Sequence, residues 1–179
     1  MTGPLPPSEL ARMVRARPLP GGPVVIEASP AECAALAARF GLSAVNWLRA
    51  EVQLAERGRA VRATGTLAAE VVQPCAVSLE DFTVSITAPI DLKFVHEAGR
   101  PTAADENAEI ELEADDCDEI AYEGEMFDLG EAVAQTLGLA IDPYAEGPDA
   151  DAARAAAGIL REGEAQGPLA ALLAGLKKD

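Results

Sequence analysis

Aromatic residues and histidine are scarce in this sequence. Only 4% of its 179 residues are Phe, Trp or Tyr, and His96 is the single histidine. The hydrophobic core must therefore consist of Leu, Val, Ile and Ala, and a chain of this length can bury a modest core of that kind. We expect one domain, with a tail where large apolar residues become sparse.

Cysteines and long apolar runs are also few. Cys33, Cys75 and Cys117 are widely spaced and odd in number, which argues against a disulfide framework and favours a reducing compartment. No apolar run approaches the roughly 20 residues that span a bilayer. Residues 1–18 lack the apolar stretch of a secretory signal. We therefore expect a cytoplasmic protein that has no membrane partner.

Motifs that hold phosphates or metals are absent as well. The sequence has no GxxxxGKS/T or GxGxxG segment and no calcium-binding loop. A zinc knuckle needs a second ligand shortly after the first, and after Cys75 that place is taken by Ser78. A nucleophile–base pair of Cys75 and His96 is conceivable, but nothing in the spacing favours contact. We expect no catalytic residue, no metal and no other cofactor.

Positive charge is sparse and unevenly placed. The net charge is -16, yet residues 1–62 hold eight arginines and five acids. Twelve acids lie between Glu97 and Glu125 alone. Such a field repels nucleic acid and anionic membranes over most of the surface. We expect no DNA partner, and any contact with RNA would have to involve the N-terminal part.

Two segments carry the capping signals of α-helices. Ser29, Pro30 and Glu32 form a capping box with proline at the first helical position, and Gly41 ends this helix. Asp128 caps a second helix. Its buried stripe is predicted to contain Leu129, Val133, Leu137 and Ile141.

Alternating apolar and polar residues predict β-strands. Residues 24–27 form a short strand, and residues 48–72 form a hairpin with Arg57 and Gly58 as its two-residue loop. The alternation resumes over residues 82–94, where Pro89 indicates a sheet edge or a bulge.

The predicted fold class is α+β. Its sheet is antiparallel and either open or barrel-like, with two main helices and an acidic loop that could include a strand over residues 108–114. We expect a single domain over residues 1–143 and a mobile acidic linker over residues 144–167. Residues 168–179 predict a short amphipathic docking helix, which either folds back onto the sheet or enters a partner's groove. Its apolar face contains Leu169, Leu172, Leu173 and Leu176.

Four arginines surround the predicted hairpin: Arg49, Arg57, Arg59 and Arg62. One interpretation is charge balance against neighbouring glutamates. The other is a small basic patch that touches RNA phosphates or an acidic partner. No aromatic residue is interleaved with these arginines, so the local sequence does not indicate base stacking. Trp47, just before the hairpin, is expected in the core.

Three blocks of sequence, in order, resemble a known family. "VVQPCAVSLEDF" leads a strand to Cys75 and places Phe82 seven residues later. "FDLGEAVAQTLGLAIDPY" and "GPLAALLAGLKK" follow as a helix and a terminal block. Over residues 60–179 the chain resembles the YceD-like family, the large ribosomal RNA subunit accumulation proteins of bacteria and plastids.

The resemblance implies a non-enzymatic factor that supports 23S rRNA accumulation and large-subunit biogenesis. Its implied partner is a large-subunit ribosomal protein, the 23S rRNA precursor, or both. Members often carry a second cysteine where this chain has Ser78, so Cys75 and Phe82 are expected to form a structural corner. The alternatives are a general protein-docking module without a ribosomal role and an enzyme that depends on Cys75.

Overall fold

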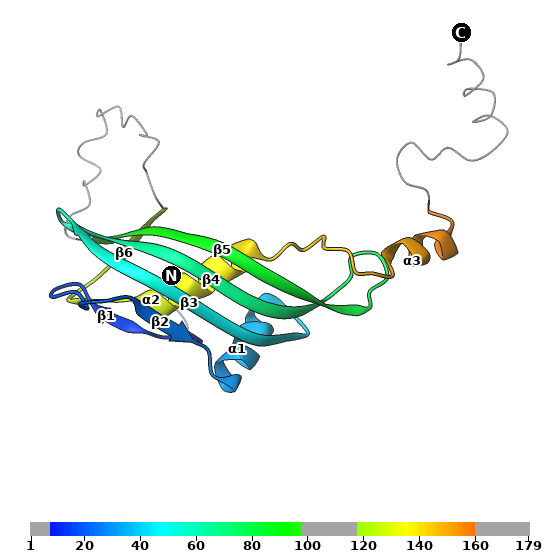
Figure 1. Cartoon of the computed structure of the whole chain (residues 1–179), viewed down its shortest axis with the longest axis horizontal. Helices are drawn as coiled ribbons and strands as arrows, with labels where there is room; N and C mark the ends of the chain where they lie inside the picture. The colour runs from blue at the N-terminus through cyan, green and yellow to red at the C-terminus, as the bar shows by residue number, and fades with distance from the viewer. Residues whose placement is uncertain (1–7, 98–117, 160–179) are drawn as a thin grey trace, which may run out of the picture. The chain divides into compact units, whose positions relative to one another are not determined.

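The computed structural model describes residues 8–97 and 118–159 of the chain (Figure 1). Its α+β fold confirms the predicted class, and its main sheet does not close into a barrel. The elements are β1 (Met13–Arg15), β2 (Val24–Glu27), α1 (Pro30–Phe40), β3 (Ala44–Arg57), β4 (Ala60–Pro74), β5 (Asp81–His96), β6 (Asp118–Tyr122), β7 (Met126–Asp128), α2 (Leu129–Ala140) and α3 (Ala150–Ala157). The strand expected over 108–114 and the helix expected over 168–179 lie outside the described residues.

The chain divides into two units. The first contains Met1–Gln73 and Thr83–Asp142, and the second contains Pro74–Phe82 and Pro143–Asp179. Helix α3 belongs to the second unit and lies inside the segment that was expected to be a linker. Its sequence is alanine-rich, and alanine has the highest helix propensity, so low hydrophobic content does not prevent a helix here. The domain boundaries at 143 and 167 stay predictions.

The capping signals of α1 act as predicted. The hydroxyl of Ser29 accepts from the backbone N–H of Glu32, and the Glu32 carboxylate accepts from the backbone N–H of Ser29 at 2.8 Å. Gly41 ends the helix with a φ of 66°, a left-handed conformation that glycine adopts without steric cost. The local sequence alone therefore determines where α1 begins and ends.

The main sheet has the strand order β2-β3-β4-β5-β6. Its β2–β3 and β3–β4 pairs are antiparallel, whereas β5 and β6 are parallel. A parallel pair needs a long connection, and residues 97–117 provide one. Strand β6 pairs with β5 only from Leu92 onward. Pro89 therefore lies where β5 is the edge among the described strands, as its missing N–H predicts.

The β3–β4 hairpin has the predicted alternation, but its predicted register is wrong. Arg57 pairs with Ala60, so the loop consists of Gly58 and Arg59. Gly58 has a φ of 59°, which suits the first loop position of a type II′ turn. The true register differs from the predicted one by two residues, so every side chain keeps its face. The hydrophobic pattern therefore cannot distinguish the two registers.

Trp47 is 45% exposed and does not belong to the core, which corrects the expectation from its size. The register of β3 shifts between Val45 and Trp47, where Asn46 is left unpaired in a bulge. After this bulge Leu48 points inward and Trp47 outward. Strand alternation thus outweighs the scarcity of other large side chains in placing this residue.

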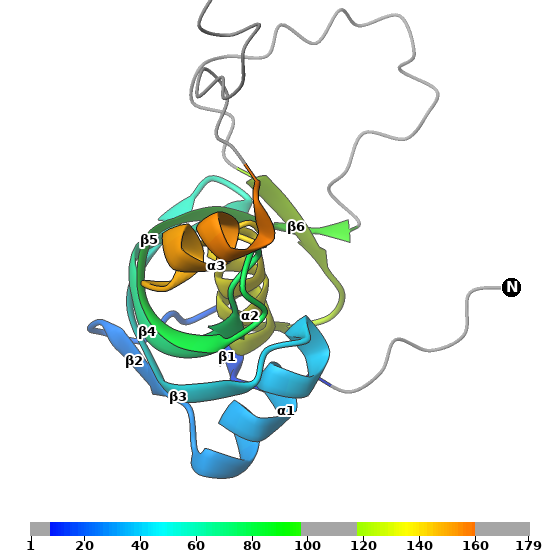
Figure 2. The same cartoon turned by 90° about the vertical axis from the view of Figure 1, so that its right-hand side faces the viewer.

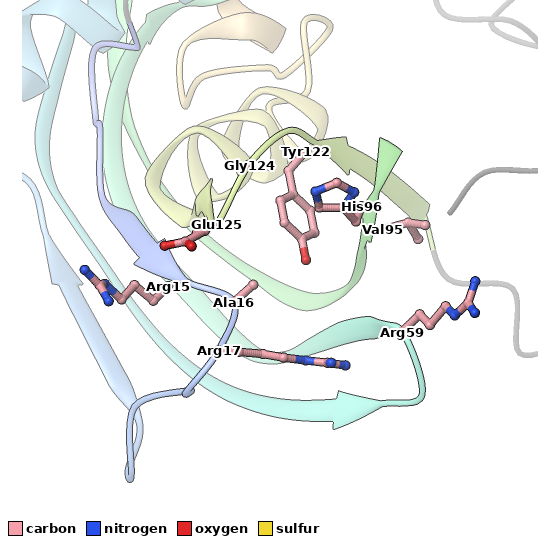
Figure 3. Close-up of a pocket in the computed structure, with 9 residues that line it drawn as sticks. All are labelled: Arg15, Ala16, Arg17, Arg59, Val95, His96, Tyr122, Gly124 and Glu125. Carbon is pink, nitrogen blue, oxygen red and sulfur yellow. The ribbon is translucent and has the colours of Figure 1, made fainter. Parts of the chain in front are cut away.

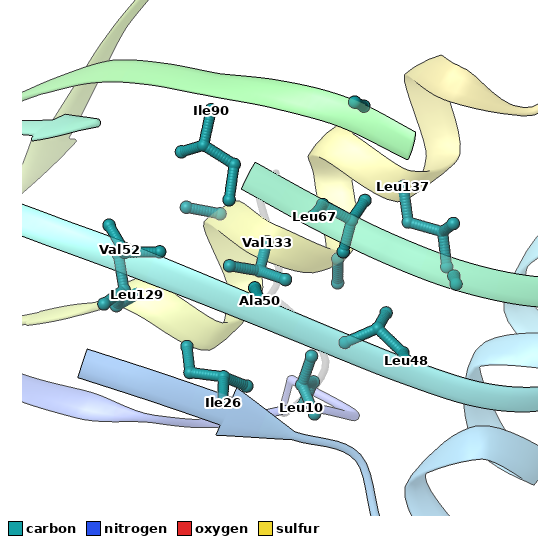
Figure 4. Close-up of a cluster of buried hydrophobic side chains, with 14 of the residues drawn as sticks. Leu10, Ile26, Leu48, Ala50, Val52, Leu67, Ile90, Leu129, Val133 and Leu137 are labelled. Atoms are coloured by element: carbon teal, nitrogen blue, oxygen red, sulfur yellow. The ribbon is translucent and has the colours of Figure 1, made fainter. Parts of the chain in front are cut away.

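Helix α2 fills the concave side of the main sheet, whose strands curve around it (Figure 2). The predicted stripe of Leu129, Val133 and Leu137 is fully buried, and Ile141 packs beside it at the helix end. Each such side chain contributes roughly 1.5–3 kcal/mol relative to an exposed one. In Figure 4 they point toward strand residues that include Ile26, Leu48, Ala50, Val52, Leu67 and Ile90.

The backbone preceding β1 approaches α2 very closely at Gly130. A Cβ atom on Gly130 would lie 1.6 Å from the carbonyl oxygen of Leu10 and 2.8 Å from the backbone nitrogen of Arg12. Both obstacles are backbone atoms, which cannot rotate away as a side chain could. Only glycine therefore allows β1 to lie against α2.

We predict that Gly130→Ala lowers the free energy of unfolding by roughly 2 kcal/mol or more, because the helix must shift to relieve the overlap. Urea denaturation of the full chain measures this change. Gly21→Ala is the matched control, since a Cβ there meets nothing within 4 Å. Equal midpoints for the two variants would contradict the close approach.

An arginine joins the two helices of the first unit. Arg39 in α1 donates two hydrogen bonds to Glu131 in α2, at 2.7 and 2.9 Å, and a third to Glu9 at 2.8 Å. The hydrogen bond from Arg39 lowers the pKa of Glu131 to about 2. In the same way, Arg12 lowers the pKa of Glu32 to about 2.

These two carboxylates predict a loss of stability in acid. Their pKa values are depressed below the ordinary 4.5, so their contribution is complete above about pH 4.5 and disappears as the pH falls toward 2. A variant with both Glu32→Gln and Glu131→Gln should lose less unfolding free energy than the parent over that range. Parallel pH profiles, measured by urea denaturation, would show that these pairs do not cause the acid sensitivity.

Candidate functional site

A pocket of about 570 Å³ lies at one end of the first unit (Figure 3). The loop between β3 and β4, the end of β1 and the turn between β6 and β7 form its walls. The chemically distinctive lining residues are Arg15, Arg17, Arg59, His96, Tyr122 and Glu125.

The pairing of β1 with β7 brings two of the arginines to the pocket. Arg15 pairs with Met126, and the backbone N–H of Ala16 donates to the carbonyl of Glu125 at 2.9 Å. Ala16 is buried, whereas Arg15 and Arg17 on either side of it are exposed. The alternation of an extended strand therefore keeps both arginine side chains out of the core.

The third arginine comes from the hairpin loop. Arg17 donates to the carbonyl oxygen of Gly58 at 2.8 Å, and its Nε lies 3.9 Å from the carboxylate of Glu56. These contacts hold the loop that carries Arg59 against the end of β1. Within residues 8–97 and 118–159, no carboxylate forms an ion pair with Arg15 or Arg59.

Two aromatic rings complete the pocket. His96 ends β5 and Tyr122 ends β6, and the parallel register places them opposite each other. Their rings meet edge to face with centroids 5.3 Å apart, and the Tyr122 ring also contacts Phe127 at 5.7 Å. Figure 3 shows the hydroxyl of Tyr122 directed toward the side where Arg17 and Arg59 lie. The ring is thus held by its neighbours while it lines the pocket.

The structure separates the four arginines selected from the sequence. Arg59 alone among them lines the pocket. Arg49 forms an ion pair with Glu27 at 2.7 Å, and Arg62 forms two hydrogen bonds with Asp91. Arg57 is exposed at the end of β3, beside the loop. Two of the four arginines, Arg49 and Arg62, therefore have acidic partners, and the basic patch stays a prediction.

Sequence reasoning missed Arg15, Arg17 and Tyr122. The two arginines belong to the motif "RAR", which could have been noticed because the N-terminal part is locally basic. Tyr122 had no local signal, since it follows Arg59 only after the whole of β4, β5 and the connection to β6. The hairpin sequence interleaves no aromatic residue with its arginines, but in the fold His96 and Tyr122 line the same pocket as Arg59.

Acidic residues lie at the same end of the first unit. Glu125 lines the pocket. A hydrogen bond with Glu97 and the charge of Glu97 both raise the pKa of Glu123, whereas the charge of His96 acts in the opposite direction. The pocket therefore has a basic wall and an acidic edge. Guanidinium groups bind phosphate oxygens with two parallel hydrogen bonds, and an aromatic ring offers a face to a base. The arrangement suits a phosphate-bearing ligand with a flat apolar part.

Cys75 lies in the second unit, in the turn after β4. Its Sγ accepts hydrogen bonds from the backbone N–H groups of Val77 and Ser78, both at 3.4 Å, and of Gly147 at 3.2 Å. Gly147 also packs against the ring of Phe82, so the structure brings Cys75 and Phe82 together around this glycine. Their role as a structural corner stays a prediction.

Hydrogen bonds from Ser78, first through its side chain and then through its backbone, lower the pKa of Cys75 to about 7. The thiol is nevertheless only 1% exposed. Burial instead raises the pKa of Cys33 in α1. The fold therefore favours the thiolate of Cys75 and the neutral thiol of Cys33.

This difference predicts different pH trends for two serine variants. The pKa of Cys75 is depressed below its ordinary value of 9.0. The stability that the Cys75 thiolate contributes is therefore complete above about pH 9 and is lost as the pH falls through about 7. The destabilisation by Cys75→Ser should therefore grow from about pH 7 to 9. For Cys33→Ser, whose parent thiol has a raised pKa, it should stay level or shrink. Urea denaturation under reducing conditions measures both, and a level profile for Cys75→Ser would contradict the assignment.

Residues 8–97 and 118–159 contain neither a metal-binding cluster nor a membrane-spanning helix. No group of three or more His, Cys, Asp and Glu side chains there is placed to hold a metal ion. No helix among those residues is long and apolar enough to cross a membrane.

Residues 63–172 match the family model described as "Large ribosomal RNA subunit accumulation protein YceD". The chain belongs to the YceD family. The match confirms the resemblance carried by the three sequence blocks. No curated protein and no solved structure matches the chain. The YceD match includes His96, Tyr122 and Glu125 but begins after Arg15, Arg17 and Arg59, so the pocket draws on residues inside and outside the matched range.

Proposed function

We propose that this protein supports the accumulation of 23S rRNA, and hence biogenesis of the large ribosomal subunit, by binding and without catalysing a reaction. The YceD match over residues 63–172 carries this proposal, because the family is named for accumulation of the large ribosomal RNA. The pocket supports a binding role, since it combines three guanidinium groups with two aromatic rings. Such a factor acts where ribosomes assemble, in the cytoplasm.

The arginine-bearing end of the first unit is the proposed contact with rRNA. Arg15 and Arg59 have no ion-pair partner among the described residues, and Arg57 is exposed beside them in the hairpin. Arg49 and Arg62 are paired with acids, so they contribute less to phosphate binding. The proposed rRNA contact thus retains Arg57 and Arg59 from the sequence prediction and adds Arg15 at the end of β1.

The acidic part of the chain is proposed to contact a basic large-subunit ribosomal protein. Twelve acids lie between Glu97 and Glu125, and such a density repels RNA but attracts a basic protein. Residues 98–117 of this segment lie outside the described part of the chain, and their charge is known from the sequence. The apolar face of residues 168–179 is proposed as a second contact with a protein. It contains Leu169, Leu172, Leu173 and Leu176.

Cells that lack this protein test the proposed function. We expect a reduced ratio of 23S to 16S rRNA and a deficit of large subunits in a sucrose gradient, both restored by the full chain. A chain that ends at Gln166 should restore them incompletely if the terminal helix contacts a partner. A normal gradient in the deletion strain would overturn the ribosomal role.

A further inference from the structure

We propose that the pocket receives one unpaired base of an RNA chain, which stacks on Tyr122 while the adjoining phosphates bind Arg15, Arg17 and Arg59. The proposal rests on the proposed function and specifies the ligand of its RNA contact. The size of the pocket, the positions of the arginines, the support of the ring and the acids at the edge favour this ligand.

The volume of the pocket fits a ligand larger than a phosphate. At about 570 Å³ it falls in the range of sites that enclose small organic molecules. An inorganic anion would leave most of this space and the Tyr122 ring unused. A base with its sugar fits within such a space and has a flat face for the ring.

The arginines border the pocket from two sides. Figure 3 shows Arg15 and Arg59 at opposite sides, with their guanidinium groups directed away from Tyr122, and Arg17 between them. A free mononucleotide has one phosphate group and could meet only one side. An RNA chain has a phosphate before and after each base, so it can meet both. The placement therefore favours a nucleotide within a chain.

The Tyr122 ring is fixed before any ligand arrives. His96 and Phe127 contact it at centroid distances of 5.3 and 5.7 Å. A side chain that is already immobilised loses little conformational freedom when a base stacks on it, so more of the stacking energy appears as affinity. The same ring carries a hydroxyl that can donate to the sugar or phosphate.

The acidic edge favours an unpaired strand over a duplex. Glu125 lines the pocket, and Glu97 and Glu123 lie nearby, close enough to each other to hydrogen-bond. These carboxylates repel the second row of phosphates that a duplex would bring. Glu125 can instead accept a hydrogen bond from a ribose hydroxyl, the group that distinguishes RNA from DNA.

Fluorescence anisotropy with the full chain and a labelled single-stranded RNA of about ten nucleotides tests the proposal. Arg15→Gln combined with Arg59→Gln should weaken binding by at least about tenfold and reduce the slope of log affinity against log salt by about 1.4, because each phosphate contact with a single strand contributes about 0.7. Arg49→Gln combined with Arg62→Gln removes the same charge outside the pocket and should change affinity less than about twofold. Equal losses for both pairs would overturn the assignment.

Tyr122→Leu should weaken binding by about tenfold, whereas Tyr122→Phe should retain most of it, because stacking needs the ring. Both exposed arginines lie outside the core, so their variants test the site even where Tyr122→Leu reduces folding. A duplex of the same sequence should bind more weakly than the single strand, and a free mononucleotide should compete poorly. Equal binding of the duplex, full competition by the mononucleotide, or no RNA binding at all would each overturn the proposal.

The outcomes separate this inference from the proposed function. If the arginine variants bind RNA normally while deletion cells still lose 23S rRNA, the pocket assignment fails and the ribosomal role stands. If the pocket binds RNA as described while deletion cells show a normal gradient, the site stands and the ribosomal role fails.

Discussion

The packing of α2 against the concave face of the sheet is the interaction on which the candidate site depends. Strand β7 ends at Asp128, directly before α2, so the buried helix fixes its position. The Asp128 carboxylate caps the helix at Glu131 and accepts from the backbone N–H of Arg12 at 2.8 Å. Leu129 donates in turn to the carbonyl of Arg12 at 3.0 Å. These bonds hold β1, and thereby Arg15 and Arg17, in place.

The charge of the protein has a local and a global component. The chain carries a net charge of -16, yet solvent-exposed charges are largely screened beyond about 10 Å at moderate salt. A ligand at the pocket therefore responds mainly to the nearest groups. Arg12, Arg39, Arg49 and Arg62 are neutralised by acids, in contacts that stabilise the fold. Arg15 and Arg59, which line the pocket, have no such partner among the described residues.

Local interactions were predictable from the sequence, and assembled ones were not. Helix caps such as Ser29 depend on side chains three residues away, so the pattern determines them. The predicted hairpin register was wrong because a shift of two residues leaves every side chain on the same face of the sheet. The conformation of Gly58 distinguishes the two registers. Tyr122 lines the same pocket as Arg59 because β6 pairs with β5, and this pairing follows a connection rich in acidic residues. The pocket therefore results from the topology, and no short sequence motif predicts it.

The division of the pocket between two parts of the sequence has a structural consequence. Its aromatic wall, His96 and Tyr122, lies within the range matched by the YceD family, and its arginine wall precedes that range. The aromatic wall can stack a base but cannot neutralise phosphates, whereas the arginine wall supplies the positive charge that neutralises them. Both are needed to bind a nucleotide, and they meet because β1 pairs with β7. The N-terminal segment therefore contributes the arginine wall of the proposed binding site, whose aromatic wall lies in the range matched by the family.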